Sequence, residues 1–116
     1  MWKIEYYKTA NGKIPVKRFI NGLDGKMRVR AAQEIALLQE LGPAIRLPYS
    51  KYLRDGIFEL RIQAASDISR IFYFFYDGKK IILTNGFIKK TQQTPAGEIE
   101  KALKYKADYE RRVKAK

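Results

Sequence analysis

The chain of 116 residues contains neither cysteine nor histidine. Without cysteine there is no disulfide framework, thiolate nucleophile or cysteine metal site. The absence of histidine removes the commonest general base and the commonest zinc ligand. The acidic residues are scattered and form no cluster typical of a divalent metal site. We therefore expect no metal and no cofactor, so any catalysis would depend on carboxylates, cationic side chains or hydroxyl groups.

Long apolar runs are also missing, and none approaches the roughly 18–20 residues of a membrane-spanning helix. The N-terminus, MWKIEYYK, alternates charged and apolar residues, unlike a signal peptide. No internal repeat, low-complexity tract or linker divides the sequence. These absences predict a single domain over residues 1–116 in a soluble, cytoplasmic protein that does not associate with a membrane.

Positive charge is abundant, with 24 lysine and arginine residues against 12 acidic residues and a formal net charge of +12. The excess is evenly spread, with 11 basic and 5 acidic residues in 1–56 and 13 and 7 in 57–116. Hydrophobic residues make up 46% of the chain, which is enough for a folded core. This balance favours a polyanionic partner such as RNA, DNA or an acidic protein, although charge also serves solubility.

The hydrophobic pattern predicts an α+β fold in the order β-α-α-β-β-β-α. Strands are expected at residues 2–7, 57–62, 68–76 and 81–88, and an irregular connection at 43–56. The first helix is expected from Pro15 to residues 21–22, and the second from an N-cap at Asp24 to Gly42. The third is expected after Thr94, with Thr94 as the N-cap and Pro95 at the first helical position. We expect the helices to pack on one face of a small, mostly antiparallel sheet, which leaves the other face partly open.

Charged residues lie in or just beyond the last three predicted strands, where apolar residues are the rule. They are Glu59, Arg61, Arg70, Lys89 and Lys90. The period of two places Glu59 and Arg61 on one face of their strand. If residues 64–67 form a hairpin loop, Arg61 lies directly opposite Arg70. Like charges that face each other destabilise a ladder, so this pairing indicates a site for an anion such as a phosphate.

Metal-free RNA cleavage needs a base for the 2′-OH proton, cations for the phosphorane, and an acid for the leaving 5′-oxygen. Arg61 and Arg70 offer forked donors to the phosphate oxygens. Glu59 is a candidate base, or alternatively a structural ion-pair partner of the arginines. Lys89 and Lys90 are candidates for the acid or for a further clamp, the alternative being an exposed strand end.

Basic and aromatic residues alternate in the connection before the first of these strands. Such a segment binds RNA through phosphate contacts and base stacking. The alternative is a surface loop whose tyrosines pack against the protein body. The candidate RNA-binding residues are Arg46, Tyr49, Lys51, Tyr52 and Arg54.

Three strings are similar to known proteins: LRDGIFELR at 53–61, SRIFYFF at 69–75 and GFIKKTQQTPAGEIEKA at 86–102. They resemble the RelE/HigB superfamily of type II toxins, in particular its phage-derived Gp49-like (HigB) branch. The resemblance covers nearly the whole chain and implies a RelE-like fold. It also implies an mRNA endoribonuclease that acts on the translating ribosome, inhibits translation and is neutralised by a cognate helix-turn-helix antitoxin protein.

The resemblance further implies roles for individual residues. Arg70 resembles the arginine that holds the scissile phosphate, and Lys89 and Lys90 fall where a basic residue assists the leaving group. Glu59 and Arg61 occupy strand positions at which the RelE subgroup has two lysines. The late tyrosine of RelE and the histidines of other HigB-like members have no counterpart here.

Without histidine, we expect a slow enzyme that depends on the ribosome to align the mRNA. Two other functions remain open at the level of the sequence. One is a non-catalytic basic module that binds RNA or the ribosome, and the other is an interaction domain for an acidic protein.

Overall fold

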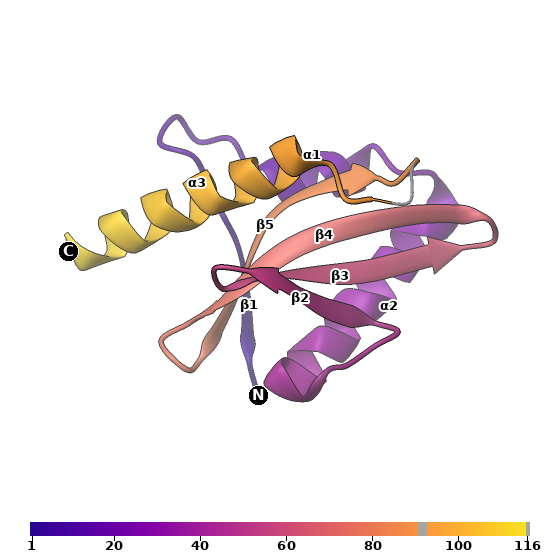
Figure 1. The fold of residues 1–116 in the computed structure, drawn as a ribbon, viewed down its shortest axis with the longest axis horizontal. Helices are drawn as coiled ribbons and strands as arrows, with labels where there is room; N and C mark the ends of the chain where they lie inside the picture. Colours follow the sequence, from indigo (N-terminus) through magenta and orange to yellow (C-terminus); the bar gives the residue numbers. More distant parts are fainter. Residues whose placement is uncertain (91–92, 116) are drawn as a thin grey trace.

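A five-stranded sheet in the order β1-β5-β4-β3-β2 forms the centre of the computed structural model, which describes residues 1–90 and 93–115 (Figure 1). β1 pairs with β5 in parallel, and the other neighbouring strands pair antiparallel. The predicted α+β class and mostly antiparallel sheet are therefore confirmed. The strands are β1 (Lys3–Tyr6), β2 (Ser50–Arg54), β3 (Ile57–Ala64), β4 (Asp67–Tyr76) and β5 (Lys80–Ile88).

The helices of the described chain are α1 (Pro15–Asn21), α2 (Gly25–Leu41), the short 3-10 helix η1 (Gly42–Ala44) and α3 (Ala96–Lys114). α2 begins as predicted, because Asp24 Oδ1 accepts a hydrogen bond from the backbone N–H of Met27 at 2.9 Å. The prediction that Thr94 caps α3 is wrong, because Pro95 is the N-cap and the Thr94 hydroxyl donates to Glu59 instead. None of the described helices is long and apolar enough to cross a bilayer.

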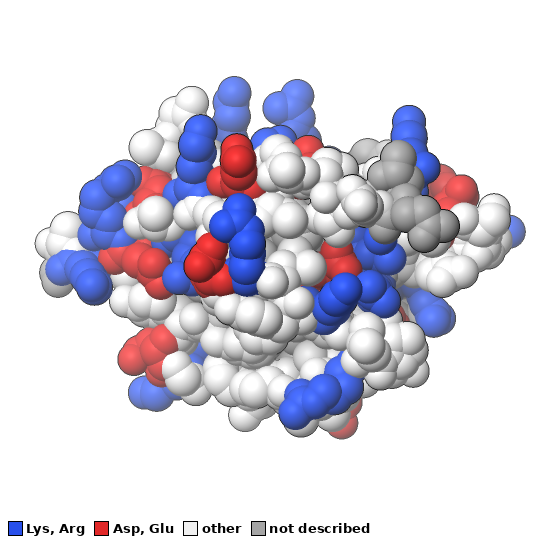
Figure 2. Space-filling model, in the orientation of Figure 1, with Lys and Arg blue, Asp and Glu red and all other residues white. Residues whose placement is uncertain are grey.

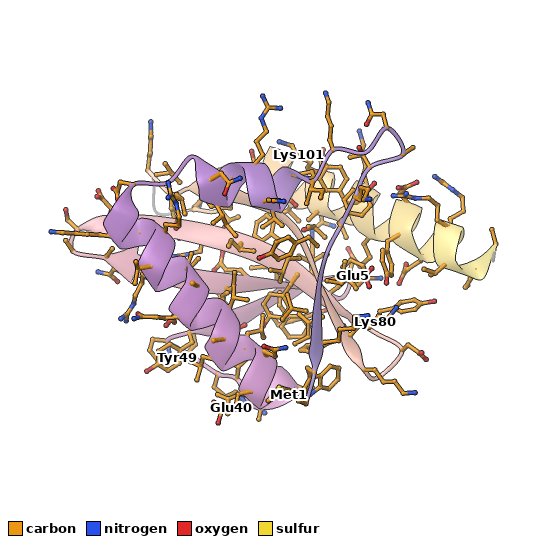
Figure 3. The ribbon with its side chains drawn as sticks, turned by 180° about the vertical axis from the view of Figure 1, so that it is seen from behind. Met1, Glu5, Glu40, Tyr49, Lys80 and Lys101 are labelled. Atoms are coloured by element: carbon orange, nitrogen blue, oxygen red, sulfur yellow. The ribbon has the colours of Figure 1, made fainter. Side chains whose placement is uncertain are left out.

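The helices cover both faces of the sheet, as the two opposite views show (Figures 1 and 3). α1 and α2 pack on one face, against Leu60, Ile62, Ile71, Tyr73, Ile81 and Leu83. α3 packs on the other face, against Ile57, Phe72, Phe74, Ile82 and Phe87. The expectation that all helices share one face is therefore wrong. The physical reason is visible in β4, where the continuous apolar run IFYFF at 71–75 is typical of a strand buried on both faces.

The predicted irregular connection at 43–56 contains β2, a strand that the sequence analysis missed. Asp55 and Gly56 take φ values of 51° and 84° and form the tight turn into β3. Asp-Gly is a strong hairpin signal, but the charged sequence SKYLR of a short edge strand lacks clear apolar alternation. β2 begins at Ser50, opposite Leu60, so β3 has an open edge beyond Arg61.

The β3–β4 hairpin has the register that its sequence predicted. Arg61 pairs with Arg70, and Gln63 pairs with Ile68. The two arginines therefore project from adjacent strands on the same face, the one that α3 covers in part. This register is what brings the candidate site together.

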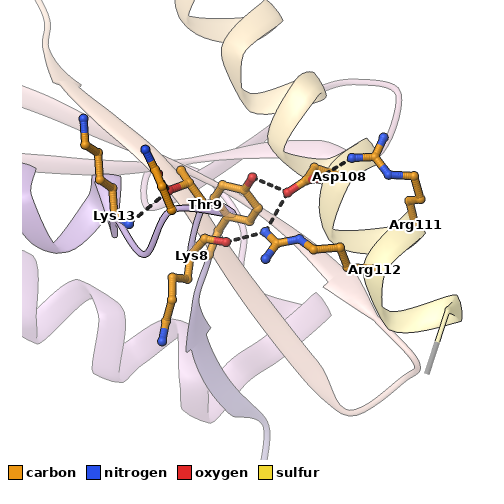
Figure 4. A network of polar contacts seen from close by, with 8 residues as sticks. Lys8, Thr9, Lys13, Asp108, Arg111 and Arg112 are labelled. Carbon is orange, nitrogen blue, oxygen red and sulfur yellow. Dashed lines mark hydrogen bonds and ion pairs between the residues drawn. The ribbon is translucent and has the colours of Figure 1, made fainter.

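Polar contacts fix the C-terminal half of α3 to the segment after β1 (Figure 4). The Tyr7 hydroxyl donates to Asp108 Oδ2 at 2.5 Å, Arg112 pairs with the same carboxylate at 2.6 Å, and Arg112 also donates to the backbone oxygen of Lys8. Burial and the hydrogen bond to Asp108 raise the pKa of Tyr7 to about 12. The hydrogen bond from Tyr7 lowers the pKa of Asp108. An anchored α3 also holds the chain that precedes it, including Thr94, over the sheet.

The packing of α1 on β5 can be tested by a substitution at Gly86. A Cβ at Gly86 would lie 2.4 Å from Cδ2 of Phe19, whereas a Cβ at Gly97 in α3 would meet nothing within 4 Å. We expect Gly86→Ala to lower the free energy of unfolding by about 1–3 kcal/mol, as overpacking does. Gly97→Ala should raise it by up to about 1 kcal/mol through helix propensity. Urea unfolding curves measure both variants. Equal free energies of unfolding for Gly86→Ala and the wild type would show that Phe19 can move away from the added methyl group without loss of stability.

Candidate functional site

A buried carboxylate lies on the α3-facing side of β3. Glu59 is only 1% exposed. Its Oε2 accepts a hydrogen bond from Arg61 Nε at 3.2 Å and lies 3.6 Å from Arg70 Nε. Its Oε1 accepts a hydrogen bond from the Thr94 hydroxyl at 3.1 Å. Both oxygens are therefore engaged, and this geometry favours the ion-pair interpretation of Glu59 over a base that faces a substrate.

The two arginines that share this carboxylate differ in exposure. Arg70 is 7% exposed, and its Nη1 donates to the backbone oxygen of Ser69 at 3.1 Å. Burial lowers the pKa of its guanidinium, and Glu59 opposes that shift. The Arg61 side chain is 29% exposed and so remains accessible at the surface. One carboxylate between two guanidinium groups leaves a net positive charge, which suits a bound anion.

Two lysines extend the positive charge on the same face. Lys51 pairs with Glu59 in the β2–β3 register, so both side chains project from one side of the sheet. The backbone N–H of Lys89 continues the β4–β5 ladder just beyond β5. Burial lowers the pKa of the Lys89 ammonium, and Arg70, Arg61 and Lys51 lower it further, while Glu59 raises it. We call Lys51, Arg61, Arg70 and Lys89, together with Glu59, the cationic cluster.

The cationic cluster lies on the face seen in Figure 2, where lysine and arginine side chains gather around a small acidic patch over β2 and β3. Lys90, a predicted site residue, is exposed, and no described interaction joins it to the cluster. The structure therefore unites four of the five predicted catalytic residues, Glu59, Arg61, Arg70 and Lys89, and leaves Lys90 outside.

The five residues predicted to bind RNA are divided among separate places. Lys51 belongs to the cationic cluster, and Tyr49 lines a cleft of about 200 Å³ beside it. Arg46 and Tyr52 line a larger cavity of about 460 Å³ on the α2 side of the sheet, which Lys51 also lines. Arg54 lies at the β2–β3 turn and forms an exposed ion pair with its sequence neighbour at 2.9 Å.

Tyr52 matches the alternative of a tyrosine packed against the protein body. Its ring makes an edge contact with Phe58, with centroids 5.0 Å apart. Its hydroxyl accepts a hydrogen bond from the backbone N–H of Gly56 at 3.1 Å. These contacts hold the Tyr52 ring against β3, although Tyr52 remains 54% exposed, and RNA binding by this segment stays a prediction.

Sequence reasoning missed Glu34, a carboxylate that lies beside the cluster. The buried positions of α2 are Met27, Ala31, Glu34 and Leu38, and Ile35 packs partly buried against the same core. Glu34 is 6% exposed and lines the same 200 Å³ cleft as Tyr49. A signal for it was present, because Glu34 stands at helical spacing from apolar residues on either side.

The chemistry that the cationic cluster offers is anion binding by guanidinium and ammonium groups, with proton transfer by a lysine whose pKa is lowered. In the part of the chain that the structure describes, no three acidic side chains are placed to hold a metal ion.

The chain matches the family model described as phage derived protein Gp49-like (DUF891) over residues 18–107. The chain belongs to this family. The matched range contains the whole cationic cluster and Thr94. The match confirms the resemblance to the Gp49-like branch, and it is consistent with the RelE/HigB toxin superfamily. A comparison with curated proteins gave no match.

We expect Glu59→Gln to destabilise this Gp49-like protein, because two guanidinium groups would then face each other without a counter-charge. Removing one partner of a buried ion pair costs about 3–5 kcal/mol. The control Glu110→Gln removes a partly exposed pair with Lys106, at 3.0 Å, and should cost less than about 1 kcal/mol. Urea unfolding measures the difference, and similar losses in both variants would contradict this role of Glu59.

Sulfate provides a second readout of the same prediction. A divalent anion that binds between Arg61 and Arg70 stabilises the folded state by mass action. It should raise the melting temperature of Glu59→Gln more than that of the wild type, in which the Glu59 carboxylate already offsets part of the positive charge of the two arginines. The same sulfate response in both proteins would argue against an anion site between the arginines.

Proposed function

We propose that this Gp49-like protein is the toxin of a type II toxin–antitoxin system and acts as a metal-independent mRNA endoribonuclease. One observation carries the proposal: Arg61 and Arg70 face each other across the β3–β4 hairpin, and both contact the carboxylate of Glu59. Two arginines held this way fit the charge and the forked geometry of a phosphodiester. Membership of the Gp49-like family supports the toxin class.

In the proposed reaction the 2′-oxygen of the RNA attacks the adjacent phosphorus and the bond to the 5′-oxygen breaks. The products are a 2′,3′-cyclic phosphate and a 5′-hydroxyl. Arg61 and Arg70 stabilise the charge that develops on the phosphate oxygens. Lys89 donates a proton to the leaving 5′-oxygen, and its lowered pKa makes it a stronger acid than an ordinary lysine. Glu59 acts as a positioning residue for the arginines.

The proposed substrate is mRNA on the translating ribosome. The net charge of +12 favours association with ribosomal RNA. Alignment of the mRNA by the ribosome would supply rate enhancement that a site without histidine lacks. The proposed antagonist is a cognate helix-turn-helix antitoxin, which would block translation inhibition by binding this protein.

Cleavage of mRNA with and without translating ribosomes tests the function. We expect 5′-hydroxyl ends to appear chiefly on ribosomes. Arg70→Ala should slow cleavage about 10²–10³-fold through the loss of transition-state stabilisation. Arg70→Lys keeps the charge but loses the fork, so it should also be slow. The control Arg111→Ala removes a guanidinium that is 73% exposed near the end of α3 and should cleave at the wild-type rate.

Other results of that assay point elsewhere. Binding of mRNA without cleavage by the wild type would favour a non-catalytic RNA-binding module. Equal rates of mRNA cleavage with and without translating ribosomes would contradict the proposed dependence on the ribosome. Growth arrest that persists in cells expressing folded Arg70→Lys would contradict the role of the arginines.

The pH dependence of cleavage tests Lys89. A general acid must be protonated, so the rate should fall as the pH rises through the pKa of Lys89. Because that pKa is lowered, the fall should occur below the value of about 10.4 for an ordinary lysine. Lys89→Arg keeps the positive charge, but its guanidinium does not give up a proton in this range, so cleavage should be slow and the alkaline fall that belongs to Lys89 should be absent. Single-turnover pH–rate profiles show this, and an unshifted alkaline limb would assign the proton transfer to another group.

A further inference from the structure

Glu34 on α2 is a buried carboxylate with little to compensate its charge. The only ion pair of Glu34 within the described chain joins its Oε1 to Arg30 Nε at 4.0 Å, and the Arg30 side chain is half exposed. No described group donates a hydrogen bond to it. Burying a carboxylate without donors is unfavourable. Neither carboxylate oxygen of Glu34 is among the buried side-chain atoms that lack a hydrogen-bond partner, so the carboxylate opens onto a cleft and not into the apolar core.

The carboxylate of Glu34 shares a cleft with the two arginines of the cationic cluster. This cleft of about 200 Å³ lies at the open edge of β3, beyond the start of β2, and Tyr49 flanks it beside α2 (Figure 3). In the described chain no ion pair within 4.0 Å joins Glu34 to Arg61 or Arg70, so space separates the groups. The cleft is lined by Arg30, Glu34, Pro48, Tyr49, Arg61, Gln63 and Arg70.

The topology places Glu34 and Lys89 on opposite sides of the arginines. Lys89 follows β5, Arg70 lies on β4 and Arg61 lies on β3. Glu34 lies on α2, which packs on the opposite face of the sheet and reaches the cleft that Arg61 and Arg70 line at the open edge of β3. In phosphoryl transfer the attacking and leaving oxygens are roughly in line through phosphorus. A phosphate held by the arginines would therefore expose one of these oxygens to Glu34 and the other to Lys89.

We propose that Glu34 is the general base of the cleavage reaction, an inference that rests on the proposed function. The Glu34 carboxylate takes the proton of the 2′-hydroxyl as the bond from the 2′-oxygen to phosphorus forms. The bond from phosphorus to the 5′-oxygen breaks, and that oxygen takes a proton from Lys89. The charge of the reactants and products balances without a co-reactant. Glu59, whose oxygens are occupied by Arg61 and Thr94, keeps its positioning role.

Single-turnover cleavage on ribosomes by Glu34→Gln tests this inference. We expect a rate about 10²–10⁴-fold below wild type, the usual contribution of general acid–base catalysis. Glu34→Asp retains a carboxylate, so it should cleave faster than Glu34→Gln and more slowly than the wild type. The control Glu40→Gln lies on the same helix, is exposed, and should behave as the wild type.

A second measurement separates catalysis from folding. An mRNA with a 2′-deoxynucleotide at the cleaved position cannot react, so it reports binding alone. Glu34→Gln should bind it on the ribosome as tightly as the wild type does, and thermal unfolding should show a folded protein. If wild-type protein and Glu34→Gln cleave equally, the assignment of Glu34 is overturned while the proposed function stands. If the wild type does not cleave at all, the proposed function is overturned, and the assignment of Glu34 with it.

Discussion

The contact of Glu59 with Arg61 and Arg70 is the interaction on which the rest of this structure depends. The hairpin register forces the two guanidinium groups onto adjacent positions of one face, where they would repel each other. A carboxylate two residues from Arg61 lies within 3.6 Å of both. The hydroxyl of Thr94 also binds this carboxylate, so the entry to α3 is tied to the same point. Fold and site thus share one ion-pair network.

This arrangement has a chemical consequence. A carboxylate that balances two arginines and accepts a hydrogen bond from Thr94 has no free oxygen for a substrate proton. The positive charge of Lys51 and Lys89 is not balanced by it, so the cationic cluster retains its attraction for an anion. Under the proposed function the site would act as a phosphate clamp in which Glu59 has a structural role, and proton transfer would fall to groups at its margins.

The sequence was sufficient where the determining signal was local. The period of two in β3 and the short loop before β4 predicted the pairing of Arg61 with Arg70 correctly. It was insufficient where contacts are distant in the chain. Thr94 has the form of an N-cap, yet its hydroxyl bonds a residue 35 positions earlier. The apolar run of β4 marked a strand covered on both faces, but nothing local indicates which helix covers which face.

The shortness of β2 connects these observations. If the edge strand extended further along β3, its backbone would close the edge beyond Arg61 and separate α2 from the arginines. Because β2 begins at Ser50, α2 reaches this edge with Glu34, while β5 ends on the other side with Lys89. In the sheet order β3 and β4 lie between this edge and β5, and within the described chain no ion pair joins Glu34 to Lys89. An edge strand that looks like a loop in the sequence thus shapes the site.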